Sequence, residues 1–225
     1  MTGAELFSLF RSFADESDNT FLTDAQVETY LKQGYLEFRN IVSNIDPEIY
    51  LTRQDFVAPN AFELDLTAVN PTGLATPLLG ATAVPGTKMQ TLIRVAQVNT
   101  ASNPVVLNYL DPSPNQKELP MWGYCLQGGK LMFGGTQTIN VRLEYIPFPN
   151  MTGIFAAAGG YVDDLERFHI CIPLLAMRYY GVRDGATQVQ AEAQLQSQLK
   201  SLIEYLTLGR SQEGSRYIVP YTWGY

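Results

Sequence analysis

The chain has 225 residues, of which 46% are hydrophobic and 16% charged, and its 15 basic and 22 acidic side chains give a formal net charge of −7. This composition excludes a disordered chain, and the absence of clustered Lys and Arg argues against a subunit that binds nucleic acid through its phosphates. So few charges also indicate that much of the surface faces other protein.

The sequence predicts a protein without a membrane segment. No apolar run approaches the ~20 residues that span a bilayer. The first residues, MTGAELFSLF, lack the basic start of a signal peptide. We therefore expect a soluble protein made in the cytoplasm, with Cys125 and Cys171 as unpaired buried thiols.

Two helices are predicted at the start of the chain. Thr2 and Glu5 have the spacing of a capping box, and apolar residues then recur with helical period over 3–15. A second capping box, Thr23 with Gln26, begins a helix over 23–44, which ends where Pro47 disfavours helix at Asp46. Its apolar stripe consists of Val27, Tyr30, Leu31, Gly34, Tyr35, Phe38 and Ile41.

From Tyr50 onward the apolar spacing changes from 3.6 to 2, which predicts six or seven short antiparallel strands. The clearest segments are 62–66, 91–98, 104–110, 122–127, 130–134 and 138–145. Gly128 and Gly129 predict a hairpin between two of them. The Pro/Gly-rich segment 68–90 is long for a loop in a compact domain, and we expect it to be mobile in the free subunit and ordered only against a neighbour or a tail component.

The helical period returns after about residue 160. Asp163 and Glu166 are acidic residues suited to a helix start, and apolar residues follow on both faces of the predicted helix. Such a helix is central in its domain or lies at a subunit interface. Pro173 is expected to kink it, because its ring clashes with the carbonyl of His169.

A final helix is predicted over 186–208, and Gly209 is expected to end it. Five glutamines in its first half make a neutral polar face suited to neighbours in a ring. Its expected inward residues are Leu195, Leu199, Leu202, Ile203 and Leu206.

The chain offers no familiar catalytic or metal-binding constellation. His169 is the only histidine, so Ser-His-Asp and multi-histidine sites cannot be assembled within one chain, and we interpret it as a hydrogen-bonded core residue. The carboxylates of Asp163, Asp164 and 15–18 lie where helix ends favour acidic residues. We therefore predict no enzyme activity, no catalytic residue, no metal site and no cofactor.

The C-terminal segment 210–225 is unusually aromatic for a chain end. Its candidate binding residues are Tyr217, Ile218, Val219, Tyr221, Trp223 and Tyr225. Docking of this tail onto its own domain and docking onto a partner are both open on the residues alone. Burial of its aromatic rings and the entropy of ordering it are of similar size, so a single tail is marginal and many copies would hold better.

Three stretches carry a resemblance to a known family: LTDAQVETYLKQGYLEFRNIVSNIDPEIYL at 22–51, VRLEYIPFPNMT at 141–152, and YVDDLERFHICIPLLAMRYYGVRDG at 161–185. With the helix that follows them, they resemble the head-to-tail adaptor (connector) proteins of tailed bacteriophages. The resemblance implies a homo-oligomeric ring, typically of twelve copies, in the neck of the virion. Its partners would be the portal protein and a tail hub, nozzle or tail-tube protein. Genomic DNA would pass through the ring without specific binding, and the C-terminal tail would bind the portal.

The predicted architecture is α+β: a bundle of about four helices with a large antiparallel β-rich insertion and an extended tail. The helical ring-forming domain is 1–49 with 161–209, the β-rich domain is 50–160, and the tail is 210–225. Residues expected in ring or core helix packing are Tyr30, Tyr35, Phe38, Phe168, Leu175, Tyr179, Leu199 and Leu202.

Two other functions stay open on the sequence. One is a monomeric β-domain that binds a small ligand or glycan, with Trp122, Tyr124 and the loop 68–90 as a stacking site. The other is an acid–base hydrolase that uses paired carboxylates.

Overall fold

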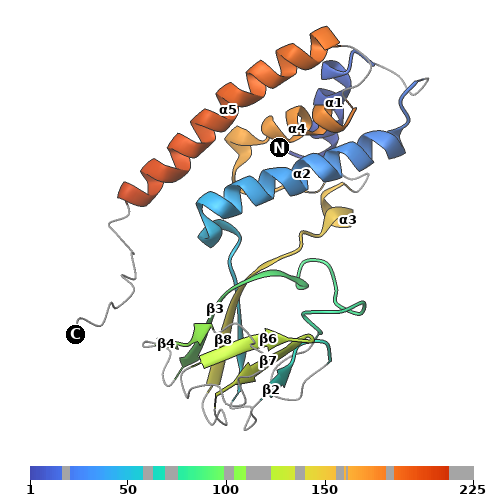
Figure 1. Cartoon of the computed structure of the whole chain (residues 1–225). Coiled ribbons are helices and arrows are strands. Elements are labelled where there is room, and N and C mark those ends of the chain that lie inside the picture. The colour runs from blue at the N-terminus through green and yellow to red at the C-terminus, as the bar shows by residue number, and fades with distance from the viewer. Residues whose placement is uncertain are drawn as a thin grey trace. The chain divides into compact units, whose positions relative to one another are not determined.

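The computed structural model describes residues 1–16, 21–57, 63–68, 76–98, 104–109, 123–134, 140–155, 160, 162–180 and 185–212. The protein has the predicted mixed α+β fold, with packed helices and two small sheets formed by the middle of the chain (Figure 1). It divides into a helical unit, Met1–Asp46 with Met151–Tyr225, and a β unit, Pro47–Asn150. None of the helices described here combines the length and apolar character that a bilayer-crossing segment needs.

Both predicted capping boxes form at the starts of the first two helices. Helix α1 (Gly3–Phe13) begins after Thr2, whose side chain accepts from the backbone N–H of Glu5. Helix α2 (Asp24–Ile45) begins after Thr23, which pairs in the same way with Gln26. Each box satisfies two backbone donors that have no partner inside the helix. Helix α2 ends at the extended Asp46, directly before Pro47, as predicted.

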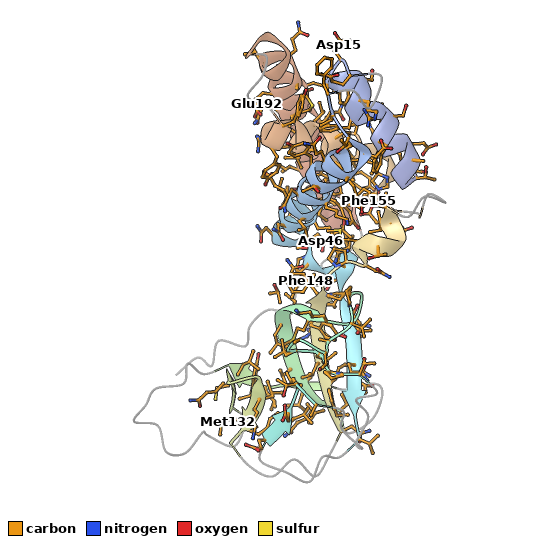
Figure 2. The ribbon with its side chains drawn as sticks, turned by 90° about the vertical axis from the view of Figure 1, so that its right-hand side faces the viewer. Asp15, Asp46, Met132, Phe148, Phe155 and Glu192 are labelled. Carbon is orange, nitrogen blue, oxygen red and sulfur yellow. The ribbon has the colours of Figure 1, made fainter. Side chains whose placement is uncertain are left out.

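The turn after α1 is fixed by backbone and side chain together. Asp15, labelled in Figure 2, has a φ of 52°, and the N–H of Glu16 donates to the Arg11 carbonyl at 3.0 Å. This is the Schellman arrangement, with an aspartate where glycine is usual. The Arg11 guanidinium also donates to the Leu22 carbonyl at 2.9 Å and to the Asp24 carboxylate at 2.7 Å. Arg11 therefore connects the end of α1 to the start of α2.

Helix α4 (Cys171–Tyr180) is the central element of the helical unit. It packs against α1, α2 and α5 (Gly185–Gln212). All seven residues from Cys171 to Met177 are buried, as predicted for a helix that is apolar all round. The two helices approach closely at Gly34 of α2, where an added Cβ would lie 2.5 Å from the Ile172 carbonyl oxygen.

The predicted kink at Pro173 is wrong. A short 3-10 turn, η2 (Glu166–Phe168), precedes α4, so the long helix expected from about residue 161 does not form. Pro173 is the third residue of α4. The first turn of a helix has no intrahelical partner for its N–H groups, so proline removes no ladder bond there.

Two details of the last helix also differ from the prediction. Helix α5 continues through Gly209 to Gln212, so this glycine does not end it. Leu195, Leu202 and Leu206 are buried and Leu199 is half-buried, but Ile203 is exposed. A leucine seam at spacings of four, three and four already fills the contact with the bundle, and Ile203 lies outside it.

In its described residues, the β unit contains eight short strands in two four-stranded sheets. They are β1 (Thr52–Phe56), β2 (Glu63–Asp65), β3 (Met89–Val98), β4 (Pro104–Val106), β5 (Asn108–Tyr109), β6 (Gly123–Gln127), β7 (Lys130–Phe133) and β8 (Asn140–Pro147). The sheet orders are β1-β8-β3-β4 and β2-β7-β6-β5. The predicted hairpin at Gly128 and Gly129 joins β6 to β7. The prediction of antiparallel strands fails at one pair, because β5 and β6 run parallel.

One apolar core is shared by both sheets of the β unit. Phe56, Val95, Leu143 and Tyr145 come from the first sheet, and Leu131 comes from the second. Part of the segment 68–90 also enters this core: Leu78 is 2% exposed, and its N–H donates to the Leu66 carbonyl at 2.9 Å. The expectation that this segment is ordered only against a neighbour or a tail component is therefore wrong for its described part from residue 76 onward.

Candidate protein–protein interface

The predicted portal-binding residues lie outside the described part of the chain. They are Tyr217, Ile218, Val219, Tyr221, Trp223 and Tyr225. The described chain ends with α5, at Gln212, so residues 210–212, which were predicted as the start of the extended tail, are helical. The role of the tail stays a prediction.

Most of the residues predicted for ring or core packing form the core of the helical unit. Tyr35, Phe38, Phe168, Leu175 and Leu202 are buried. Tyr30 and Leu199 are half-buried, and the Tyr30 ring stacks on Phe10 with centroids 6.0 Å apart. Tyr179 differs from the rest, since it is 47% exposed and its hydroxyl donates to Glu37 at 3.0 Å. Tyr179 is therefore a surface residue.

A polar network is buried where α2 meets the segment leading into α4. His169 is fully buried, and its Nε2 lies 2.6 Å from Oδ1 of Asp163. The same oxygen accepts from the N–H of Leu165 at 2.9 Å, and the hydroxyl of Tyr35 donates to the Val162 carbonyl at 3.3 Å. Burial, followed by the nearby charge of Asp163, raises the pKa of Tyr35 to about 12. The prediction that His169 is a hydrogen-bonded core residue is confirmed.

Among the described residues, the network joins an imidazole to a carboxylate and to no side-chain nucleophile. In the described part of the chain, the hydrogen bond of His169 goes to a carboxylate and not to a Ser, Thr or Cys side chain. Cys171 is also fully buried, which raises the pKa of its thiol to about 11 and disfavours the reactive thiolate. Among the same residues, no group of three or more His, Cys, Asp or Glu side chains could hold a metal ion. The network instead connects α2 to the start of α4.

A second polar cluster attaches the first half of α5 to its neighbours. The guanidinium of Arg178 on α4 donates to Glu192 on α5 at 3.0 and 2.8 Å and to Glu37 on α2 at 2.9 Å. Gln196 donates to Glu192 as well, at 2.8 Å. Arg178, followed by Gln196, lowers the pKa of Glu192 to about 2. Glu192 is labelled in Figure 2. This cluster lies at the surface, since its three charged side chains are between 28% and 41% exposed.

Most side chains of α5 between Val189 and Leu208 are exposed. From Val189 to Leu208 its buried residues are Leu195, Leu202 and Leu206. Apolar side chains are exposed along the same stretch: Val189 is 70% exposed, Ile203 45%, Tyr205 52% and Leu208 59%. Isolated exposed apolar residues are normal. These four lie on two faces of the helix, Val189 with Ile203 and Tyr205 with Leu208, and they make α5 a candidate interface. Figure 1 shows the length of this helix beside α4.

A charged ladder on the first sheet was missed by the sequence prediction. Glu144 on β8 is buried between Arg53 on β1, at 3.1 Å, and Arg94 on β3, at 2.7 Å. Arg142 and Asp55 form a second, bidentate pair across β8 and β1, at 2.7 and 2.8 Å. The signal was present as charged residues two apart in TRQDF and VRLEY, the spacing that places both on one face of a strand.

Comparison with known proteins assigns no family: no protein-family model matches the chain, and no curated protein matches it. Function must therefore be inferred from the surfaces described above.

Proposed function

We propose that this chain is a structural virion protein, a head-to-tail adaptor. Its copies form a dodecameric ring in the neck of a tailed bacteriophage, between the capsid portal and the tail hub, nozzle or tail-tube protein. The ring lines the channel through which the genome leaves. The chain is assembled in the host cytoplasm, and its mechanism is assembly and not catalysis.

The observation that supports this proposal most directly is the exposure of α5. A 28-residue helix that buries three of the twenty side chains from Val189 to Leu208 gains little from its own bundle along that stretch. A helix of this kind is well suited to contact neighbouring copies. The aromatic segment that follows α5 in the sequence is a second candidate binding segment. In a ring, every copy would contribute one such segment to the same partner.

The ligand-binding alternative is weakened by the burial of Tyr124. Its predicted stacking site used this ring, but Tyr124 is 5% exposed and lies in the shared core of the two sheets. A buried ring offers no face to a sugar or other ligand. Trp122, the other aromatic residue of that prediction, lies outside the described residues.

Removal of the tail tests the proposal. A variant that lacks residues 215–225 should keep its fold and melting temperature, because the described core of the helical unit lies before these residues. It should fail to bind the portal encoded with it, as measured by co-sedimentation or by imaging of assembled particles. A matched variant of full length, with Tyr221, Trp223 and Tyr225 changed to Ser, separates the aromatic contacts from the length of the tail.

Two outcomes would contradict the proposal. Normal attachment of the deletion variant to portals would show that the tail is not needed for portal binding. A large drop in melting temperature would show instead that the tail docks on its own domain.

A further inference from the structure

Helix α5 carries two seams of side chains, and in the described part of the chain one of them is packed into the bundle and the other is exposed. The inner seam is Leu195, Leu199, Leu202 and Leu206, which are buried or half-buried. The outer seam is Val189, Ala193, Gln196, Lys200, Ile203 and Thr207, all of which are exposed. Its spacings of four, three, four, three and four keep these residues on one face of the helix, as in a helix that packs against another helix.

The outer seam is almost free of charge. Val189, Ala193 and Ile203 are apolar, Gln196 and Thr207 are neutral, and Lys200 supplies the one charge. A helix face that stays in water normally carries charged residues. The composition of this seam is instead that of an interface, in which charged residues are depleted.

Charge also favours a particular partner. Each copy of the chain carries a net charge of −7, so two copies repel each other where acidic surfaces meet. The outer seam avoids this repulsion because it has no acidic residue, and Lys200 attracts an acidic neighbour. A second copy of this chain therefore fits the seam by charge.

We infer that the outer seam of α5 packs against a second copy of this chain. This inference rests on the proposed ring and names the surface that forms it. In a ring, the seam of one copy meets a different surface on the next copy, since the contact is heterologous.

The size of the seam determines how stable one such contact can be. Twenty residues of helix from Val189 to Leu208 extend about 30 Å, and a face about 10 Å wide covers roughly 300 Å². A stable complex buries about 800 Å² on each partner. A single seam contact is therefore too small for a lasting dimer, and it gains strength when ring closure or portal binding holds many copies together.

Photo-crosslinking from α5 tests the inference. Both native cysteines, Cys125 and Cys171, are buried, so a new surface thiol can be labelled selectively under native conditions. Full-length Val189→Cys is labelled with a benzophenone maleimide and irradiated, both free at high concentration and bound to portal. The control is Val57→Cys in the β unit, at a site of similar exposure, 64% against 70%.

We expect a ladder of crosslinked copies from position 189, several-fold stronger than from position 57, that extends beyond the dimer on the portal. Ile203→Glu in the Val189→Cys background should weaken the ladder several-fold, because it puts an acidic side chain on the seam of a chain with net charge −7. The melting temperature should not change, because Ile203 is exposed. Equal and low yields from both positions would overturn the inference.

Two further outcomes separate the inference from the proposed function. A product that stops at the dimer supports the α5 contact between copies but contradicts the ring. Crosslinks from position 189 to the portal, with none to another copy, overturn the inference and leave the adaptor function intact.

Discussion

Helices α4 and α5 are neighbours in the chain and in the bundle, yet they use their surfaces in opposite ways. Helix α4 has ten residues and buries seven in succession, from Cys171 to Met177. Helix α5 has 28 residues, and between Val189 and Leu208 it buries three. The stability of the helical unit is therefore expected to depend on α4. Helix α5 leaves most of its side chains in this stretch exposed.

The two helices also differ in how polar groups fix them. The entry to α4 is held by a buried network of Tyr35, Asp163 and His169. The first half of α5 is held by a surface ion pair, between Arg178 and Glu192. Buried polar groups are costly to disturb, whereas surface pairs contribute little. Substitutions and pH should therefore affect the two attachments to different extents.

The largest effect is expected from truncation in α4. Leu175→Ala leaves a cavity at a fully buried position, so it should lower the free energy of unfolding of the helical unit by about 3–5 kcal/mol. Val189→Ala on α5 is the matched control and should change it by about 0.5 kcal/mol or less. Urea unfolding followed by circular dichroism measures both. Similar losses of stability at the two positions would contradict the expectation that the stability of the helical unit depends on α4 more than on α5.

Adjacent residues within α5 provide the next test. Leu202 is fully buried and Ile203 is 45% exposed. Leu202→Ala should cost about 2–4 kcal/mol, because it removes a central residue of the inner seam. Ile203→Ala should cost about 0.5 kcal/mol or less in the isolated chain. A loss at Ile203 as large as that at Leu202 would show that the outer seam is already covered within one copy.

Local patterns predicted the helices well where start signals and periodicity agreed. Thr23 with Gln26 and the stripe that includes Tyr35 and Phe38 fixed α2 to within a residue or two. The alternation in 138–145 predicted β8 in the same way. These features depend on contacts between residues close in sequence or on one buried face.

The errors arose where distant contacts decide the structure. Strand β1 was not recognised, because its charges at Arg53 and Asp55 are balanced by Glu144 and Arg142, about ninety residues later. Leu78 reaches the β core from a segment without secondary structure of its own. Ile203 has a helical spacing compatible with burial, but it lies outside the inner seam and is exposed. Periodicity shows which residues could be buried, while the number of neighbouring elements determines which ones are.

Alkaline pH should destabilise the helical unit through Tyr35. Its pKa is about 12 in the folded chain and near 10.0 when unfolded. Below pH 10, Tyr35 is protonated in both the folded and the unfolded state, and its full contribution to the free energy of unfolding is present. Between pH 10 and 12 the unfolded state loses the proton first, so about 2–3 kcal/mol should be lost as the pH rises through the folded pKa.

Tyr35→Phe should remove the part of this alkaline slope that comes from Tyr35. The pH dependence of urea unfolding between pH 9 and 12 is the measurement. Tyr145→Phe is the control, because burial also raises the pKa of Tyr145, but this residue lies in the β unit. An unchanged slope in the helical unit of Tyr35→Phe would contradict the assignment.

Acid should weaken the attachment of α5 through Glu192, and the loss of stability should be smaller than the alkaline loss at Tyr35. Glu192 has a pKa of about 2 in the folded chain against an ordinary value of 4.5, since Arg178 and then Gln196 stabilise its charged form. A lowered pKa stabilises the folded state above the unfolded value, and this contribution is lost as the pH falls from about 4.5 through 2. The side chain is 41% exposed, so solvent screening limits the loss to about 1 kcal/mol or less.

Glu192→Gln should therefore reduce stability slightly at pH 6 and should flatten the acid limb between pH 4.5 and 2. The control is Glu204→Gln, which changes an exposed carboxylate further along the same helix. Hydrogen exchange of α5 amides gives a local readout, and the wild type should lose protection around Glu192 as the pH falls through this range, after correction for intrinsic exchange rates. The α4 amides should keep their protection from exchange. The ion pair between Arg178 and Glu192 attaches α5, and the buried core of α4 does not depend on this pair. If protection in α4 fell together with that in α5, the two helices would be one cooperative unit, and the contrast between a core helix and a surface helix would fail.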